Sequence, residues 1–209
     1  MCRGSDLAYR NLTALAALAR QAGIELFVSM EESAKTDAIL AIYERATVAY
    51  ANIGITLQAQ LNRTAQDLNS LQPIPGRIRI VKGAYQEPEQ LAIPRSSALN
   101  ERYVQLVEQA IQLGHRVSIA THDESIVDEV IKRGWIHDPG VEFELLYGIR
   151  PDLSSQLKKA GNPVRIYLTY GHEWYLYLCH RIAEYPPNLF QAILDITSTE
   201  KATPVLEYE

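Results

Sequence analysis

The chain has 209 residues, of which 47% are hydrophobic and 22% charged, and its formal net charge is −5. This composition is typical of a globular protein with one sizeable core, so we expect a single domain over residues 1–209. The negative charge and the absence of lysine or arginine runs argue against nucleic acid as a partner and allow at most peripheral membrane contact. Two cysteines make no disulfide framework, which favours a reducing, cytoplasmic location.

The first part of the chain predicts helices and strands in alternation. A helix over residues 6–22 should end at Gly23, a strand should follow at 25–30, and Ser33 is placed to cap the next helix. A second strand is expected at 53–60. The intervening helix is indicated by apolar residues at the spacing of one helical face, namely Ile39, Ile42, Tyr43, Ala46 and Ala49.

The rest of the chain continues this alternation, which predicts parallel βα units. No Gly-x-Gly-x-x-Gly follows a strand, whereas polar residues follow nearly every strand, and this favours a (β/α)8 barrel over a doubly wound sheet. About six units are present, so we expect an α/β, TIM-like barrel that is incomplete at its N-terminus. The remaining expected elements are a helix at 62–70, a strand at 77–85, a helix at 99–113, a strand at 116–122, a helix at 125–132, a strand at 141–147, a helix at 152–160, a strand at 164–170, and helices at 172–185 and 188–196.

The strand at 77–85 carries charges that a buried strand has no packing reason to carry. Arg79 and Lys82 lie at or near its end, where an unpaired cation would cost several kcal/mol to bury. Gly83 allows a ligand or backbone to approach closely, and Tyr85 offers a flat aromatic face with a hydroxyl. We therefore expect an anionic or electron-rich group over this strand end.

Lys82 and the residues of two further segments each have more than one interpretation. Thr121, His122 and Asp123 follow a strand, where they could hold a polar ligand or cap the next helix. Lys82 could form a Schiff base, as in barrel aldolases, or bind an anion. On the helix from residue 172, Arg181 could hold a carboxylate or pair with Glu184 in solvent. No zinc spacing, His-Glu-x-x-His or Gly-x-Ser-x-Gly occurs, so a metal or serine mechanism is unsupported.

Taken together, these segments resemble the catalytic barrel of the proline dehydrogenase family, in its monofunctional bacterial form. The similarity extends over about residues 23–196, and five motifs occur in the family's order on the expected strands and helices. The motifs are Ile55-Thr-Leu-Gln-Ala59, Arg79-Ile-Val-Lys-Gly-Ala-Tyr85, Ala120-Thr-His-Asp123, Glu142-Phe-Glu-Leu-Leu-Tyr-Gly-Ile-Arg150 and Arg165-Ile-Tyr-Leu-Thr-Tyr-Gly171, followed by Tyr177, Arg181-Ile-Ala-Glu184 and Pro187-Asn188.

The resemblance implies a set of site residues around FAD and L-proline. Arg79 matches a residue near the flavin N5, and Arg181 matches the arginine that holds the proline carboxylate. The implied catalytic residues are Arg79, Tyr85, Tyr167 and Arg181. The implied substrate-binding residues are Ala84, Tyr85, Leu146, Tyr167, His180, Arg181 and Glu184. The implied cofactor-binding residues are Gln58, Arg79, Val81, Lys82, Gly83, Ala84, Thr121, His122, Asp123 and Glu144, with no metal.

The chain also departs from the family pattern at several positions. Ser29 stands where the family has aspartate, His180 where it has a second arginine, Thr169 where proline is usual, and Glu144 where glutamine is usual. The chain also starts after the family's first strand, which carries a substrate-binding lysine. His180 and Ser29 could compensate for each other or could mark a site that has decayed.

The resemblance implies FAD-dependent oxidation of L-proline to pyrroline-5-carboxylate, with electrons passing to a quinone at the inner face of a membrane. Two alternatives stay open from the residues: a truncated or degenerate, non-catalytic barrel, and a Schiff-base barrel that uses Lys82. Hydroxyproline stays open as a substrate. Because an incomplete parallel barrel has unpaired edges, we also expect completion by another chain or oligomerisation.

Overall fold

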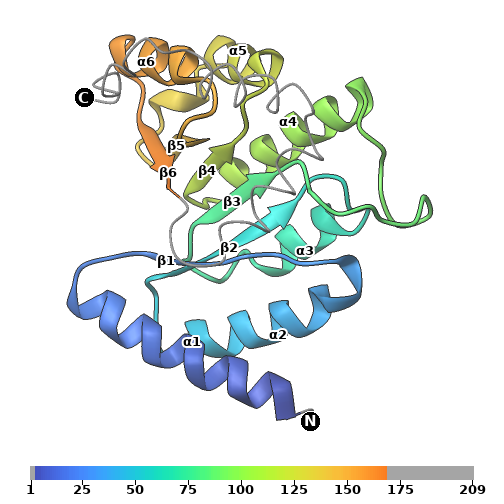
Figure 1. Ribbon diagram of the computed structural model, residues 1–209, viewed down its shortest axis with the longest axis vertical. Helices are drawn as coiled ribbons and strands as arrows, with labels where there is room; N and C mark the ends of the chain where they lie inside the picture. The colour runs from blue at the N-terminus through green and yellow to red at the C-terminus, as the bar shows by residue number, and fades with distance from the viewer. Residues whose placement is uncertain (1–2, 169–209) are drawn as a thin grey trace, which may run out of the picture. The chain divides into compact units, whose positions relative to one another are not determined.

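The computed structural model describes residues 3–168, and strands alternate with helices throughout this range (Figure 1). The bounds are α1 (Arg3–Gln21), β1 (Leu26–Val28), η1 (Ser33–Lys35), α2 (Thr36–Thr47), β2 (Ile53–Gln58), α3 (Thr64–Ser70), β3 (Ile78–Val81), α4 (Ser97–Gln112), β4 (Val117–Ala120), α5 (Glu124–Lys132), η2 (Trp135–His137), β5 (Val141–Leu146), α6 (Pro151–Lys159) and β6 (Val164–Tyr167). The predicted α/β order is thus confirmed over these residues. The two helices expected after residue 168 lie outside the described range.

Strands β1 to β5 are parallel neighbours in chain order, and β6 follows β5 in the sheet. The chain divides into two compact units, residues 1–144 and 145–209, so the expected single domain stays a prediction. In the second unit, the described elements are the end of β5, α6 and β6. There the amide of Tyr147 donates to the carbonyl of Tyr167 over 2.9 Å.

One face of the sheet in the first unit is an apolar core covered by helices. Helix α2 packs on β2, and α4 packs on β3 and β4. The strand residues that point to these helices are aliphatic and no more than 2% exposed: Ile55, Leu57, Ile78, Ile80, Val117 and Ile119. Tyr103 of α4 is fully buried with them, and its hydroxyl donates to the carbonyl of Ile80 over 2.6 Å. Removal of this apolar area from water is the main force that holds the unit together.

The opposite face of the same strands is polar. Thr56 of β2 is the register partner of Arg79, which pairs with Ser118, and Ser118 pairs with Glu142. Because register partners in neighbouring strands point to the same side of a sheet, these four side chains form one row. A barrel interior is more often filled by bulky aliphatic residues. The polar row is therefore a special feature of this chain.

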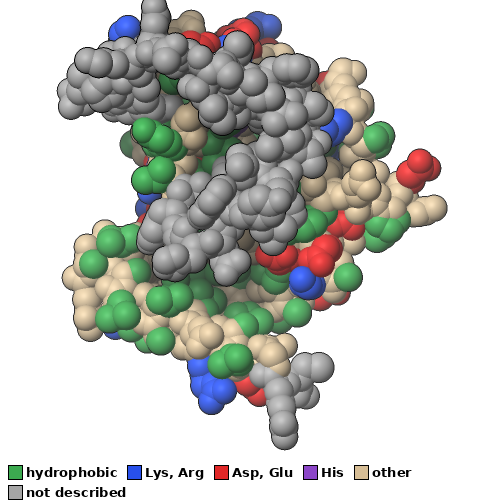
Figure 2. All heavy atoms as spheres, in the orientation of Figure 1, with side chains coloured by type: hydrophobic (Ala, Val, Ile, Leu, Met, Phe, Trp, Pro, Cys, Tyr) green, Lys and Arg blue, Asp and Glu red, His purple; other side chains and the backbone are tan. Residues whose placement is uncertain are grey.

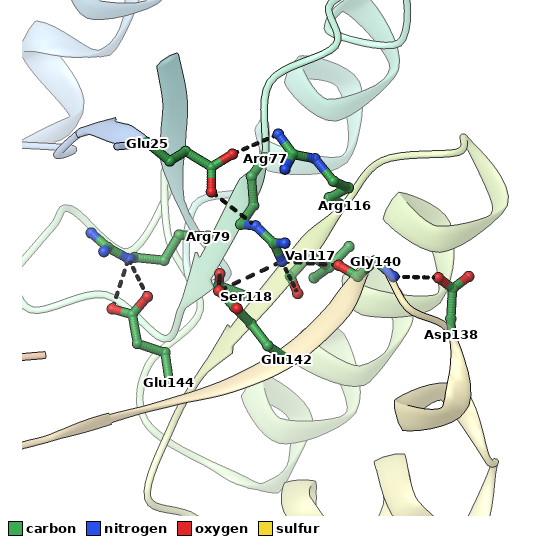
Figure 3. A network of polar contacts seen from close by, with 10 residues as sticks. All are labelled: Glu25, Arg77, Arg79, Arg116, Val117, Ser118, Asp138, Gly140, Glu142 and Glu144. Atoms are coloured by element: carbon green, nitrogen blue, oxygen red, sulfur yellow. Dashed lines mark hydrogen bonds and ion pairs between the residues drawn. The ribbon is translucent and has the colours of Figure 1, made fainter. Parts of the chain in front are cut away.

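Arg77, which precedes β3, connects this polar face to Glu25, the residue before β1 (Figure 3). Its guanidinium is 3.2 Å from the Glu25 carboxylate and 3.5 Å from that of Glu142, and it donates to the carbonyls of Val117 and Gly140. Arg77 is 7% exposed. Its charge is thus buried, but carboxylates and carbonyls surround it, as burial of a cation requires.

The turn after β1 differs from the expectation. Ser33 does not cap a helix, because the turn η1 comes first and α2 begins at Thr36 without a side-chain cap. The Ser33 amide and hydroxyl instead donate to the carboxylate of Glu87, over 2.7 and 2.5 Å. A carboxylate distant in sequence thus replaces the local backbone groups as the partner of this serine.

Helix α1 packs on α2 through one face and leaves apolar side chains on another. Ala16 is fully buried, whereas Leu7, Leu15 and Leu18 are more than half exposed. Figure 2 shows hydrophobic side chains in the lower part of the view, where Figure 1 places α1. The expected contact with another chain or a second copy stays a prediction.

Within residues 3–168, no helix has the length and apolar character needed to span a bilayer.

We predict that Arg77→Met lowers the free energy of unfolding by about 3–5 kcal/mol, because it leaves buried carboxylates without their cation. Arg116 is the matched control, since it also contacts Glu25, over 2.5 Å, but its side chain is 47% exposed. Arg116→Met should cost about 1 kcal/mol or less. Urea denaturation of both variants measures the difference, and equal losses would show that the buried network is not a stability element.

Candidate active site

The carboxyl ends of β2, β3 and β4 bring the predicted polar residues to one edge of the sheet. Pairing continues past the strands, because the amide of Ala59 donates to the carbonyl of Val81 and that of Gln60 to the carbonyl of Lys82. Thr121 and His122 follow β4 at the same edge. Parallel strands present their carboxyl ends on one side, so the sequence motifs of three separate strands meet here.

Arg79 lies on the polar face and is 9% exposed. Its Nε is 2.8 Å from one Glu144 oxygen and donates to the other over 3.0 Å, as Figure 3 shows. Its guanidinium carbon also lies 4.2 Å from the centre of the Phe27 ring. The electron-rich partners expected for Arg79 are thus a carboxylate and an aromatic face of the protein itself. The pairing with Glu144, which is 65 residues away, could not be predicted from the sequence.

Lys82 and Asp123 form a second ion pair, between the ends of β3 and β4. The Lys82 Nζ is 2.6 Å from an Asp123 oxygen, and the Asn100 amide donates to that same oxygen over 3.0 Å. Asp123 is also the N-cap of α5, because its other oxygen accepts from the Ser125 amide over 3.0 Å. The expected helix cap is thus confirmed for Asp123, whereas its role in holding a polar ligand stays a prediction.

The electrostatic environment of Asp123 favours its charged form. Burial alone would raise its pKa, but the hydrogen bonds from Lys82 and Ser125 and the charge of Lys82 outweigh burial. The pKa is lowered to about 2. Asp123 is therefore a fixed anion at neutral pH that holds the lysine in place.

Gly83 and Tyr85 follow β3 in a loop that packs against the end of β2. Gly83 has a φ of +116°, and a Cβ at this position would lie 2.3 Å from the Gln60 side chain. The close approach expected at this glycine is thus made by Gln60, whose amide donates to the Tyr85 carbonyl over 3.0 Å. The hydroxyl of Tyr85 donates to Glu31 over 2.8 Å. Ala84, between them, is exposed.

The remaining predicted residues of the first unit line the same strand ends. Gln58 is buried, and its amide donates to the Glu31 carbonyl over 2.7 Å. Thr121 is buried, and its hydroxyl accepts from the Asp123 amide over 3.1 Å. Val81 and His122 are half-buried. Glu31 was not among the predicted site residues, although its place in the turn after β1 was a usable signal.

The predicted substrate residues beyond residue 144 belong to the second unit. Leu146 is half-buried at the end of β5, and Tyr167 is 38% exposed at the end of β6. These two residues lie at the carboxyl ends of adjacent strands within that unit. His180, Arg181 and Glu184 lie outside the described residues, as does Thr169.

Comparison with known proteins gives a consistent result over most of the chain. The sequence model of a family described as proline dehydrogenase matches residues 5–187. The chain is 34% identical over 195 residues to proline dehydrogenase 2 of Bacillus subtilis, covering 92% of this chain and 64% of that protein. It is 38% identical over 190 residues to proline dehydrogenase of Deinococcus radiodurans, covering 88% and 61%. The chain thus spans less than two thirds of the length of these curated relatives.

A solved structure with the same fold is proline utilization A of Bradyrhizobium japonicum. The TM-score is 0.80 at 22% identity, over 87% of this chain and 22% of that chain. A second is proline utilization A of Bdellovibrio bacteriovorus, with a TM-score of 0.77 at 20% identity, over 85% of this chain and 22% of that chain. At these identities the likeness concerns the fold alone. It confirms the expected TIM-barrel type of βα arrangement.

We predict that the Lys82–Asp123 pair contributes stability that is lost in acid. The pKa of Asp123 lies below its ordinary value of 3.8, so the contribution is present above about pH 4 and is lost as the pH falls towards about 2. Asp123→Asn should flatten the acid limb of a plot of unfolding free energy against pH. Lys82→Met should flatten it partly, because the hydrogen bonds to Asp123 from Asn100 and Ser125 remain. An unchanged acid limb in Asp123→Asn would contradict the assigned pair.

Proposed function

We infer a flavin-dependent oxidation of L-proline from one premise: this chain belongs to the proline dehydrogenase family. The observation that carries the proposal is the match of the family over residues 5–187, which includes every motif at the strand ends. The family is FAD-dependent. The reaction would convert L-proline to pyrroline-5-carboxylate, and a quinone would then accept the electrons.

The chemistry of the residues at the ends of β2, β3 and β4 supports FAD as the cofactor. Gln58, Arg79, Lys82 and Thr121 carry hydrogen-bond donors, and the flavin ring and the pyrophosphate of FAD offer acceptors. Thr56, beside Arg79 in the strand register, has a buried hydroxyl without a hydrogen-bond partner among the described residues. A polar ligand on this face could supply the partner that the Thr56 hydroxyl lacks there.

In the proposed reaction, proline loses a hydride from carbon and a proton from nitrogen, and a C=N bond forms. Bound FAD supplies the hydride acceptor, which no side chain can supply. Arg79 contributes a fixed cation that favours the added negative charge. The Glu144 carboxylate partly neutralises the charge of Arg79. Lys82, held by Asp123, contributes a second cation.

The family resemblance assigns contact with the proline ring to Ala84 and Tyr85 of the first unit. It assigns the same role to Leu146 and Tyr167 of the second unit. Arg181, with His180 beside it, would hold the carboxylate, and Glu184 would support this arginine. Apolar contact with the ring contributes affinity, whereas the carboxylate contact fixes the orientation of the carbon that loses its hydride.

The alternative of a Schiff base on Lys82 requires that the ion pair with Asp123 be broken. A carbonyl substrate could react with Nζ only after Nζ leaves the Asp123 carboxylate, which lies 2.6 Å away. Borohydride trapping with a carbonyl substrate tests this alternative directly. Absence of a covalent adduct on Lys82 would exclude it.

We predict that the purified chain, loaded with FAD, loses its visible flavin absorption when L-proline is added without oxygen. The same protein without proline is the control, and hydroxyproline in place of proline tests the substrate preference. Uptake of FAD without bleaching by proline would contradict the proposed reaction. A chain that takes up no FAD would support the non-catalytic alternative.

A further inference from the structure

We propose that Glu31, in the turn after β1, is a positioning residue that holds Tyr85 in the orientation needed to contact the substrate ring. The inference rests on the proposed function for the identity of the substrate. Glu31 is 54 residues from Tyr85 in sequence, yet its carboxylate accepts a hydrogen bond from the Tyr85 hydroxyl over 2.8 Å. A hydrogen bond to a charged acceptor is stronger than one between neutral groups.

The backbones of both residues are anchored to the same strand end. The Gln58 amide donates to the carbonyl of Glu31 over 2.7 Å, and the Gln60 amide donates to the carbonyl of Tyr85 over 3.0 Å. Both glutamines are buried at the end of β2. The loop after β1 and the loop after β3 are therefore placed by one short segment at the end of β2, in which a single residue, Ala59, separates the two anchoring glutamines.

A second, reversed contact links the same two loops. The amide and hydroxyl of Ser33 donate to the carboxylate of Glu87, over 2.7 and 2.5 Å. The first loop thus gives a carboxylate to Tyr85, and the second loop gives a carboxylate to Ser33. Arg95 adds a hydrogen bond to the carbonyl of Gly83 over 3.1 Å, which restrains the loop just before the tyrosine.

The charges around Glu31 favour this contact at neutral pH. Lys35 lies closer to Glu32, at 2.9 Å, than to Glu31, at 3.9 Å, so Glu32 is its main partner. Burial, followed by the hydrogen bond to Glu31, raises the pKa of Tyr85 to about 12, which keeps the phenol protonated as a donor. The tyrosine ring is thus restrained at its hydroxyl and at its backbone, and less side-chain freedom is lost when a substrate binds.

The test is made in a Lys35→Met background, so that this cation cannot turn to Glu31 when Glu32 is removed. It compares Glu31→Ala with Glu32→Ala, which removes the neighbouring carboxylate but not the acceptor of the Tyr85 hydroxyl. Hydrogen exchange of residues 83–92 should become faster in Glu31→Ala and stay near the background value in Glu32→Ala. In the FAD-loaded protein, KM for proline should rise roughly fivefold to tenfold in Glu31→Ala, while kcat changes by less than about twofold. Glu31→Gln, which keeps an acceptor, should restore most of the affinity.

A Tyr85→Phe background separates positioning from a general structural effect. Glu31→Ala should add no further rise in KM there, because its effect acts through the tyrosine hydroxyl. The inference is overturned on its own if the parent protein oxidises proline but Glu31→Ala matches Glu32→Ala in both exchange and KM. If the parent protein takes up FAD but does not oxidise proline, the proposed function is wrong. Measurement of the parent protein alone shows this outcome, so the two failures can be told apart.

Discussion

The pairing of charges on the polar face of the sheet is the constraint on which the rest of the site depends. β3 and the residue before it direct Arg77 and Arg79 to the face opposite helices α2 and α4, and β5 supplies Glu142 and Glu144 as their partners. A buried cation is stable only when such partners are present. The alternation of aliphatic and charged residues along these strands therefore serves the fold on one face and the site on the other.

This constraint also governs what the site can bind. Arg79 with Glu144, and Lys82 with Asp123, place two cations and two carboxylates at one strand edge, so its net charge is small. A ligand with many acceptors would therefore bind there mainly through directed hydrogen bonds. Attraction by the net charge of the site would contribute less. Such a site suits an extended polar cofactor better than a free anion. Under the proposed function, Glu144 places a carboxylate 2.8 Å from the cation assigned to the cofactor site, at a position where the family resemblance implies glutamine.

The fold could be predicted from periodicity, because aliphatic residues recur at every second position of a strand, as Ile78 and Ile80 do, and at one face of each helix. The family resemblance was also confirmed, because the sequence model of the family matches residues 5–187. The partners of the charged residues could not be predicted, because Arg79 and Glu144 are 65 residues apart and meet only through strand register. Ser33 was misassigned for the same reason, since its partner Glu87 is 54 residues away.

The most direct test of the account is the affinity for FAD of the double variant Arg79→Met/Glu144→Gln, which removes the buried ion pair without leaving an unpaired charge. The control is Arg133→Met/Glu129→Gln, at α5, which removes an ion pair elsewhere on the fold. Titration of flavin fluorescence should give wild-type affinity for the control and at least roughly tenfold weaker binding for the double variant. Equal affinities in all three proteins would contradict the assignment of the β3 strand end as the cofactor site.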